Sequence, residues 1–251
     1  MSALRAPVAA VCFLTRAPLG RWIALDGDDV MRSGPAFPIV GAGIGAAVGA
    51  VAAALAGSLS DLLAVAIAVV GGTLLTGALH LDALADAADA LGTHSRERAL
   101  EVMRDPTIGA FGATAIGLNL LLKAAALTAL VGDESVVRFA LAAGALSRVV
   151  PVLLAAGLPY ARAGDGAGVS LTRGGHLRAA CAAAIAIAIG VGVAGGDGAA
   201  LAGFAGALTI ATAIVYRRWL GGITGDALGA ALELTETGAL VVAVALVGGH
   251  P

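Results

Sequence analysis

The sequence predicts an all-α fold, a polytopic membrane helix bundle of about seven transmembrane helices. Its composition is the first reason, because 59% of the 251 residues are hydrophobic and only 13% are charged. A soluble domain has roughly 25% charged residues, so this chain lacks the polar surface that such a domain needs. The other reasons are a series of long apolar stretches and the recurrence of arginine in alternate connections between them.

Seven apolar stretches approach the length of about 20 residues that a helix needs to cross a bilayer. We expect spans at approximately 36–57, 62–80, 110–131, 135–157, 177–195, 199–216 and 226–247. Because no soluble domain fits between them, residues 1–251 are interpreted as a single integral membrane domain. The shorter apolar run at 6–14 lacks a cleavage site, so we expect a retained interfacial helix there. The glycine-rich stretch at 39–46 favours close helix packing over a dinucleotide-binding turn, because the apolar run continues without a polar face.

The distribution of arginine predicts the orientation, because basic residues are retained on the cytoplasmic side of a membrane. Arginines precede the first span and recur in the second, fourth and sixth connections, whereas only Arg138 lies near the third. The N-terminus is therefore expected inside and the C-terminus outside. The lipid bilayer is an expected partner, and the formal net charge of -2 gives no reason to expect nucleic acid. Cys12 and Cys181 are isolated and fit no disulfide or zinc-site spacing.

Three aspartates lie on one face of a predicted helix that follows the second span. Asp82, Asp86 and Asp89 have the spacing i, i+4 and i+7, which falls within an arc of about 60°. None has a basic residue three or four positions away, so a divalent cation would relieve their repulsion, and Mg²⁺ prefers such oxygen ligands. A solvated acidic face is the alternative, and the alanines between the aspartates weaken it. His80 lies about 160° from Asp82 on a continuous helix, which leaves a capping, a core and a catalytic role open.

A short helix with charged residues is predicted at 96–104, stopped by Pro106. Arg104 is the candidate for binding phosphate, because a guanidinium group binds phosphate oxygens in pairs. Surface ion pairs with Glu97 and Glu101 are the alternative.

The last predicted span begins with acidic residues. Asp226, Glu233 and Glu236 share an arc of about 80°, and too few apolar residues follow Glu236 to cross a bilayer alone. These side chains therefore enter the membrane or a cavity open to the cytoplasm, with a structural ion pair inside the bundle as the alternative. Lys123 in the third span and Arg148 in the fourth are the available cations. We expect Lys123 to pair with Glu233 or Glu236, because an unpaired ammonium group near the midplane is costly.

The motifs that contain these residues follow one another along almost the whole chain. They are FLTRAP (13–18), FP (37–38), TGALHLD (76–82), LADAAD (84–89), EVMRD (101–105), IG (108–109), Lys123, SR (147–148) and TGDALGAALE (224–233). Together they resemble the cobalamin synthase family, the adenosylcobinamide-GDP ribazoletransferases. Ala83 and Ala90 stand where that family usually has glycine, a departure that keeps the helix but removes backbone freedom.

The resemblance implies a metal-assisted phosphoryl-group transfer at a bacterial cytoplasmic (inner) membrane. In it, α-ribazole or its 5′-phosphate joins adenosylcobinamide-GDP, GMP leaves, and Mg²⁺ is the expected cofactor. The residues expected to be catalytic are Asp82, Asp86, Asp89 and Glu233. Those expected to bind substrate or phosphate are His80, Arg104, Lys123 and Arg148, and those expected to bind metal are Asp82, Asp86, Asp89 and Asp226.

Two other classes of protein stay open at this point. A CDP-alcohol-phosphotransferase-like membrane enzyme also uses an Asp-rich helix, but its Asp-Gly-x2-Ala-Arg pattern is absent, since Ala87 follows Asp86. An ion-coupled transporter would repeat its interrupted helices, and no such repeat is visible here. The sequence leaves the oligomeric state open, a homo-oligomer included, together with the lower-base preference and the identity of the general base.

Overall fold

The computed structural model describes all residues except 1, 133–134, 163–166 and 249–251. The described part of the chain contains no β-strand, and its extended backbone pairs in an isolated bridge between Tyr160 and Ile223. The predicted all-α fold is confirmed.

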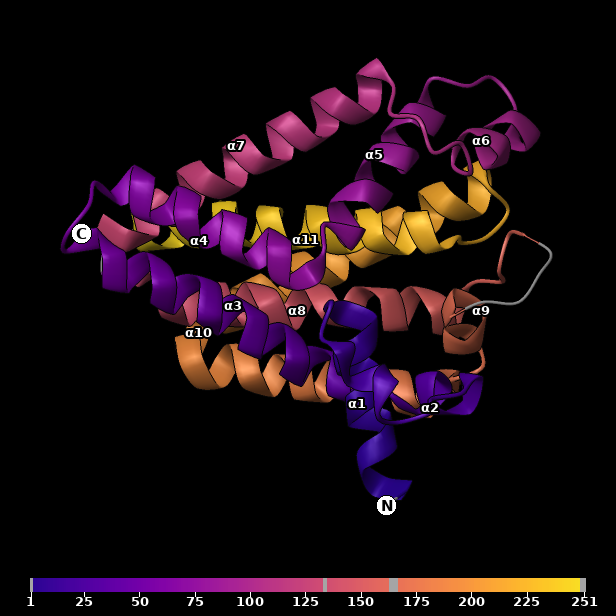
Figure 1. Ribbon diagram of the computed structural model, residues 1–251, viewed down its shortest axis with the longest axis horizontal. Coiled ribbons are helices and arrows are strands. Elements are labelled where there is room, and N and C mark those ends of the chain that lie inside the picture. The colour runs from indigo at the N-terminus through magenta and orange to yellow at the C-terminus, as the bar shows by residue number, and fades with distance from the viewer. Residues whose placement is uncertain (1, 133–134, 163–166, 249–251) are drawn as a thin grey trace.

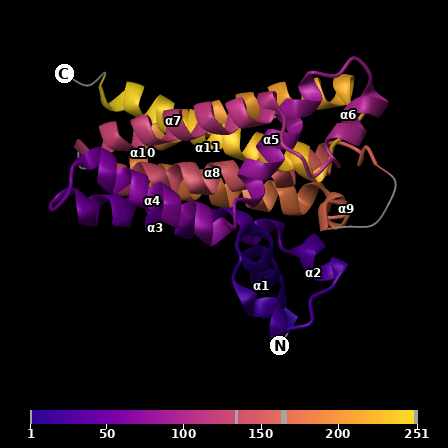
Figure 2. The same cartoon turned by 45° about the horizontal axis from the view of Figure 1, so that its top comes forward.

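Short helices form the N-terminal region and long helices form a bundle (Figure 1). The N-terminal elements are α1 (Ser2–Leu14), η1 (Pro18–Arg21), α2 (Gly27–Arg32) and η2 (Gly34–Ala36). The bundle consists of α3 (Phe37–Ala56), α4 (Asp61–Thr76), α5 (Leu79–Leu91), α6 (Arg96–Val102), α7 (Ala110–Gly132), α8 (Val136–Gly157), α9 (Ala167–Thr172), α10 (Gly175–Trp219) and α11 (Gly225–Val247). Figure 2 shows α1 and α2 projecting from one side of this bundle.

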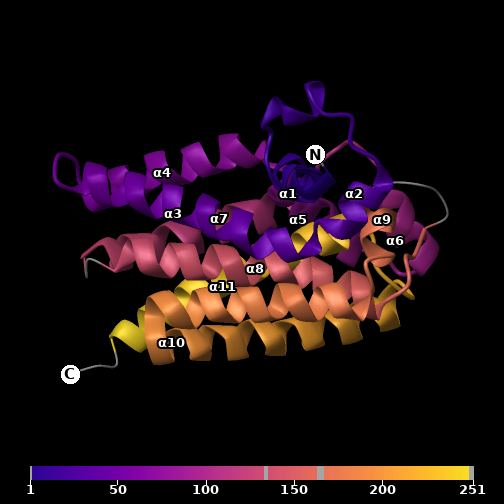
Figure 3. The same cartoon turned by 90° about the horizontal axis from the view of Figure 1, so that it is seen from below.

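Among the described residues, five helices are long and apolar enough to cross a membrane, or six if the bent pair α4–α5 counts as one span. The chain is therefore a multi-pass membrane protein, but the expected number of seven is not confirmed by length and composition. The two spans predicted at 177–195 and 199–216 both lie in α10, which is broken at Gly195 (φ 56°, ψ -130°). A Cβ at Gly198 would overlap the backbone of Gly190, so the two arms of α10 lie back along each other (Figure 3).

The span predicted at 62–80 is wrong at its C-terminal end. Helix α4 ends at Thr76, and α5 leaves at 87° to it. Gly77 (φ 65°) and Ala78 (φ 57°) both adopt left-handed backbone conformations, which an α-helix cannot contain. A side chain on Gly77 would also overlap that of Arg16. The aspartates therefore lie on a separate helix set across the bundle.

Glycines allow α8 to lie at the centre of the bundle. A Cβ at Gly41 would overlap the carbonyl group of Gly144, and one at Gly45 would overlap that of Ala140. The glycine-rich stretch at 39–46 lies within α3 and packs against α8, so its interpretation as a packing surface is confirmed.

Three arginine-bearing connections meet at one end of the bundle. Arg96 in α6 donates to the carbonyl oxygen of Ala161 at 3.4 Å, and its guanidinium group lies beside Gly221. The α3–α4 turn and the C-terminal part of α11 lie at the opposite end (Figure 1). This separation agrees with the predicted sidedness, while the orientation in a membrane stays a prediction.

Candidate functional site

The three aspartates of α5 are less buried than most of the alanines around them. Alanine residues form the packed side of the helix, and the buried ones are Ala83, Ala85, Ala87 and Ala90. Ala83 faces Gly229 of α11, where an added Cβ would lie 2.5 Å from the Ala83 methyl group. Asp82 is exposed, and Asp86 and Asp89 are half-buried. The alanines between the aspartates are thus helix-packing residues, and Ala83 and Ala90 fit a regular helix without glycine.

Asp226 is positioned at the start of α11 by the connection that precedes it. The side chain of Thr224 caps α11 by accepting from the backbone N–H of Ala227 at 3.1 Å. The hydroxyl group of Tyr160 accepts from the backbone N–H of Gly225 at 3.2 Å. Asp226 therefore lies in the first turn of a helix whose entry is fixed from two sides.

Asp82 and Asp226 line the same cavity, which has a volume of about 390 Å³. The rest of its lining is largely apolar and consists of Cys12, Phe13, Leu79, His80, Ala83, Pro151, Gly168, Gly225, Leu228, Gly229 and Leu232. We call this the acidic cavity. Asp86 lies on the same face of α5 as Asp82 and lines a second cavity with it. Carboxylates of α5 and α11 therefore line one cavity, while the metal-binding role of Asp226 stays a prediction.

Arg104 lies at the mouth of this site. It lines a smaller cavity of about 140 Å³ together with Asp82, Asp86 and the turn at 105–108. That turn is held by Asp105, which accepts from the backbone N–H of Thr107 at 2.9 Å and from its hydroxyl group at 2.5 Å. These hydrogen bonds hold the pKa of Asp105 below its usual range. A guanidinium group beside two aspartates at an open mouth suits the predicted phosphate contact.

Asp89 has a contact that the sequence did not reveal. Its Oδ2 accepts from the backbone N–H of Gly109 at 2.7 Å, and its Oδ1 accepts from that of Gly112 at 2.8 Å. Both carboxylate oxygens therefore cap the start of α7, and a side chain at either glycine would collide with them. Asp89 therefore caps α7, and its predicted metal-binding role stays a prediction.

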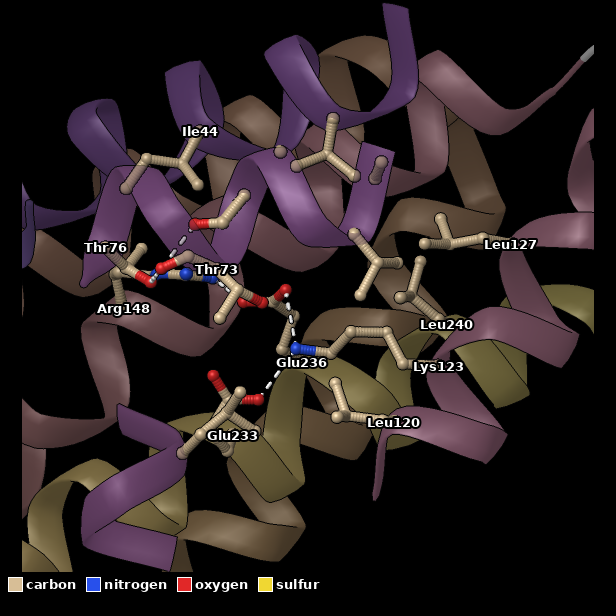
Figure 4. Close-up of a pocket in the computed structure, with 16 residues that line it drawn as sticks. Ile44, Thr73, Thr76, Leu120, Lys123, Leu127, Arg148, Glu233, Glu236 and Leu240 are labelled. Carbon is tan, nitrogen blue, oxygen red and sulfur yellow. Dashed lines mark hydrogen bonds and ion pairs between the residues drawn. The ribbon is translucent and has the colours of Figure 1, made fainter. Parts of the chain in front are cut away.

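Glu233, Lys123 and Arg148 lie in a different place, around a buried cavity of about 40 Å³ (Figure 4). Lys123 Nζ lies 2.7 Å from Glu233 Oε2 and 3.2 Å from Glu236 Oε1. Asn119 also donates to Glu233 Oε2, at 3.1 Å, and Arg148 is paired with Glu236. The expected pairing of Lys123 with these glutamates is confirmed. We call these five residues the buried network.

The buried network balances its own charges, because two cations face two carboxylates. Such pairing offsets the desolvation free energy of placing charged side chains in the membrane, and it does so without any ligand. This geometry supports the structural alternative for Glu233, Lys123 and Arg148. Their catalytic and phosphate-binding roles stay predictions.

His80 belongs to the acidic cavity. Its side chain is buried and lines that cavity. Within the described part of the chain, its Nε2 has no hydrogen-bond partner. A buried polar atom without a partner is costly, so a bound ligand that hydrogen-bonds to Nε2 would stabilise it.

The donor set of the acidic cavity fits Mg²⁺ in part. Over the described residues, no three His, Cys, Asp or Glu side chains are arranged as a ready metal site. Magnesium usually keeps several waters and binds one or two carboxylates together with substrate phosphates, so a preformed cage is not required. Asp82 and Asp226 supply carboxylates of that kind in the acidic cavity, and Asp86 lines a second cavity together with Asp82.

Arg162 is the site residue that the sequence did not single out. Its Nη2 lies 3.0 Å from Asp226 Oδ2, although 64 positions separate the two residues. In the sequence it was simply one of the arginines of the fourth connection. Nothing in its local sequence indicates a partner in α11.

Comparison with known proteins agrees with the motifs. A family model described as cobalamin-5-phosphate synthase matches residues 6–244. An adenosylcobinamide-GDP ribazoletransferase of Chlorobium phaeovibrioides is 40% identical over 207 residues, covering 80% of this chain and 82% of that protein. Those of Leptothrix cholodnii (38% identical, 92% of this chain and 91% of the relative) and Geotalea daltonii (37%, 98% and 99%) match over more of their length. No solved structure matches.

Proposed function

This chain belongs to the cobalamin-5-phosphate synthase family, and from that premise we propose that it is an adenosylcobinamide-GDP ribazoletransferase. Its substrates would be adenosylcobinamide-GDP and α-ribazole or its 5′-phosphate, and GMP would be the second product. The observation that carries this proposal is that Asp82 lines one cavity with Asp226 and a second cavity with Asp86, in a chain of this family.

The protein need not form a covalent bond to the substrate in this reaction. A ribose hydroxyl oxygen forms a bond to the phosphorus on the cobinamide side of the diphosphate, the P–O bond to GMP breaks, and the hydroxyl proton leaves to a base. Such transfers depend on positioning and on stabilising negative charge. We assign proton removal to a carboxylate of α5, either Asp82 or Asp86, because both face the mouth of the site.

Mg²⁺ would be held by Asp82, Asp86 and Asp226, where its charge would offset that of the diphosphate and of the departing oxygen. Arg104 would bind phosphate oxygens from the mouth of the site.

The apolar side of the acidic cavity suits the planar, largely apolar base of α-ribazole. Phe13, Leu79, Leu228 and Leu232 line it, which is typical of pockets for small organic ligands. The Nε2 of His80 would hydrogen-bond to a polar atom of the bound ligand. In this arrangement the base lies in the apolar part, and the reacting groups lie beside the aspartates.

We further propose that the whole chain, 1–251, acts as one integral membrane domain in the cytoplasmic membrane. With the N-terminus inside, the end of the bundle that carries α6 and α9 would face the cytoplasm (Figure 1). The acidic cavity would then open to the compartment that supplies nucleotides.

The test is GMP release by purified protein that is given adenosylcobinamide-GDP, α-ribazole and Mg²⁺. Asp82→Asn and Asp86→Asn should each lower the rate at least about a hundredfold, a few kcal/mol of barrier, because each removes a metal-binding charge. Asp28→Asn is the matched control, since Asp28 is exposed on α2, outside the site. Near-normal rates in both site variants, or full activity in excess chelator, would show that the metal-assisted proposal is wrong.

A further inference from the structure

We propose that Arg162 is a phosphate-binding residue of the acidic cavity, paired with Asp226 in the free protein and with the substrate diphosphate in the complex. This inference rests on the proposed function. It starts from the position of Arg162, whose side chain is only 14% exposed and lies 3.0 Å from Asp226, itself 21% exposed.

The segments that precede Arg162 and Asp226 are hydrogen-bonded to each other. Ala161 donates to the carbonyl oxygen of Ile223 at 2.8 Å, and Ile223 donates to that of Pro159 at 2.9 Å. A side chain at Gly222 would overlap the carbonyl group of Pro159, so the two segments are in direct contact. Arg162 is thereby anchored next to the entry of α11.

The pairing with Asp226 leaves the guanidinium group poorly satisfied. Among the described residues, the buried Nε of Arg162 has no hydrogen-bond partner, and its buried Nη2 contacts Asp226 without good hydrogen-bond geometry. A buried guanidinium group is stable when its planar donors are used in pairs, and phosphate oxygens match that geometry. The unpaired Nε and the poorly aligned Nη2 therefore point to an anionic ligand with several oxygens.

The charge of the site leads to the same conclusion. Asp82, Asp86 and Asp226 would repel the diphosphate of the substrate. Arg162 lies 3.0 Å from Asp226, so its positive charge lies beside the carboxylates, while Arg104 lies at the mouth. When the diphosphate binds, its oxygens replace the carboxylate of Asp226 as the partner of the Arg162 guanidinium group. Asp226 then becomes available for other contacts.

This exchange predicts opposite effects for the two partners of one ion pair. Arg162→Gln removes the phosphate contact and weakens substrate binding. Asp226→Asn removes the competitor for Arg162 and one repelling charge, so it strengthens binding when no divalent cation is present. A purely structural ion pair would instead make both variants weaken binding in parallel.

The experiment measures equilibrium binding of adenosylcobinamide-GDP to the purified, detergent-solubilised protein in excess chelator, where no turnover is needed. Arg162→Gln should raise the dissociation constant about tenfold or more, and Arg162→Lys should raise it less, because a single charge is retained. Asp226→Asn should lower it. Arg173→Gln, an exposed arginine of the same connection, is the matched control and should leave it unchanged.

Thermal unfolding of each variant guards against loss of the fold, and Arg162→Lys provides a folded variant if Arg162→Gln is unstable. The role of Arg162 would be overturned if Arg162→Gln bound the substrate as strongly as the wild-type protein does. It would also be overturned if Asp226→Asn weakened substrate binding as much as Arg162→Gln does. Neither result would affect the proposed function. Failure of the wild-type protein to bind adenosylcobinamide-GDP in chelator but not in Mg²⁺ would overturn the exchange at Arg162, whereas failure to bind it under either condition would overturn the proposed function as well.

Discussion

Replacing Lys123 by methionine tests whether the buried network stabilises the bundle. Lys123 contacts both glutamates of α11, at 2.7 Å and 3.2 Å, and its removal leaves Glu233 with Asn119 as its remaining hydrogen-bond donor in the network. Breaking a buried ion pair by removing one partner costs about 3–5 kcal/mol. Because Asn119 still donates to Glu233 and polar contacts in membranes are often weaker, we expect a loss near the lower end, about 3 kcal/mol.

The same geometry predicts an order among variants. Glu233→Gln should cost less than Lys123→Met, because Lys123 still has Glu236 at 3.2 Å. Combining the two changes should recover part of the loss, since the remaining Arg148–Glu236 pair balances its own charge. The free energy of unfolding, measured by denaturant titration in detergent micelles, gives these differences directly.

Leu122→Met is the matched control on α7, because Leu122 is exposed on the bundle surface and this change keeps similar volume. A Lys123→Met variant within about 1 kcal/mol of the wild-type protein would refute the stabilising role. So would a double variant whose loss equals the sum of the two single losses, because independent sites behave additively.

Two further predictions concern orientation and the cap of α7. Reporter fusions at Ser60, Gly196 and Pro251 should report an external location, although Pro251 lies outside the described residues, and cytoplasmic readings at two of these three would overturn the topology. Asp89→Ala should lower the free energy of unfolding by about 0.5–2 kcal/mol through loss of the α7 cap, whereas Asp82→Asn should leave it nearly unchanged. Equal stability of the Asp89→Ala variant and the wild-type protein in denaturant titrations would contradict the capping role.

Features that depend on one helix at a time were predictable from the sequence. The bounds of α3 and α7 agree with the predicted spans 36–57 and 110–131, because span length follows from bilayer thickness. The shared face of Asp82 and Asp86 follows from helical periodicity alone. One contact between distant helices was also predictable, because the cost of an isolated charge in an apolar bundle required a partner for Lys123.

The other features that depend on contacts between distant segments were not predictable from the sequence. The end of α4 was missed because the hydropathy continues through Ala78, a residue that rarely adopts the left-handed conformation found there. The capping of α7 by Asp89 requires α5 to lie against the start of α7. The contact between Arg162 and Asp226 requires two connections to pair through the bridge at Tyr160 and Ile223.

The distribution of charge explains why the acidic cavity, and not the buried network, is the candidate for catalysis. In the buried network, Lys123 and Arg148 match two glutamates, so the charges are balanced in the free protein. In the acidic cavity, Asp82 adds to Asp226, with Asp86 one helical turn away, and the ion pair found there among the described residues uses Arg162. Charges that are paired within the protein need no ligand to be stable. An excess of carboxylates beside an anionic substrate, in contrast, becomes stable only when cations bind as well. Binding of the substrate and of the cation should therefore strengthen each other, because each reduces the repulsion that opposes the other.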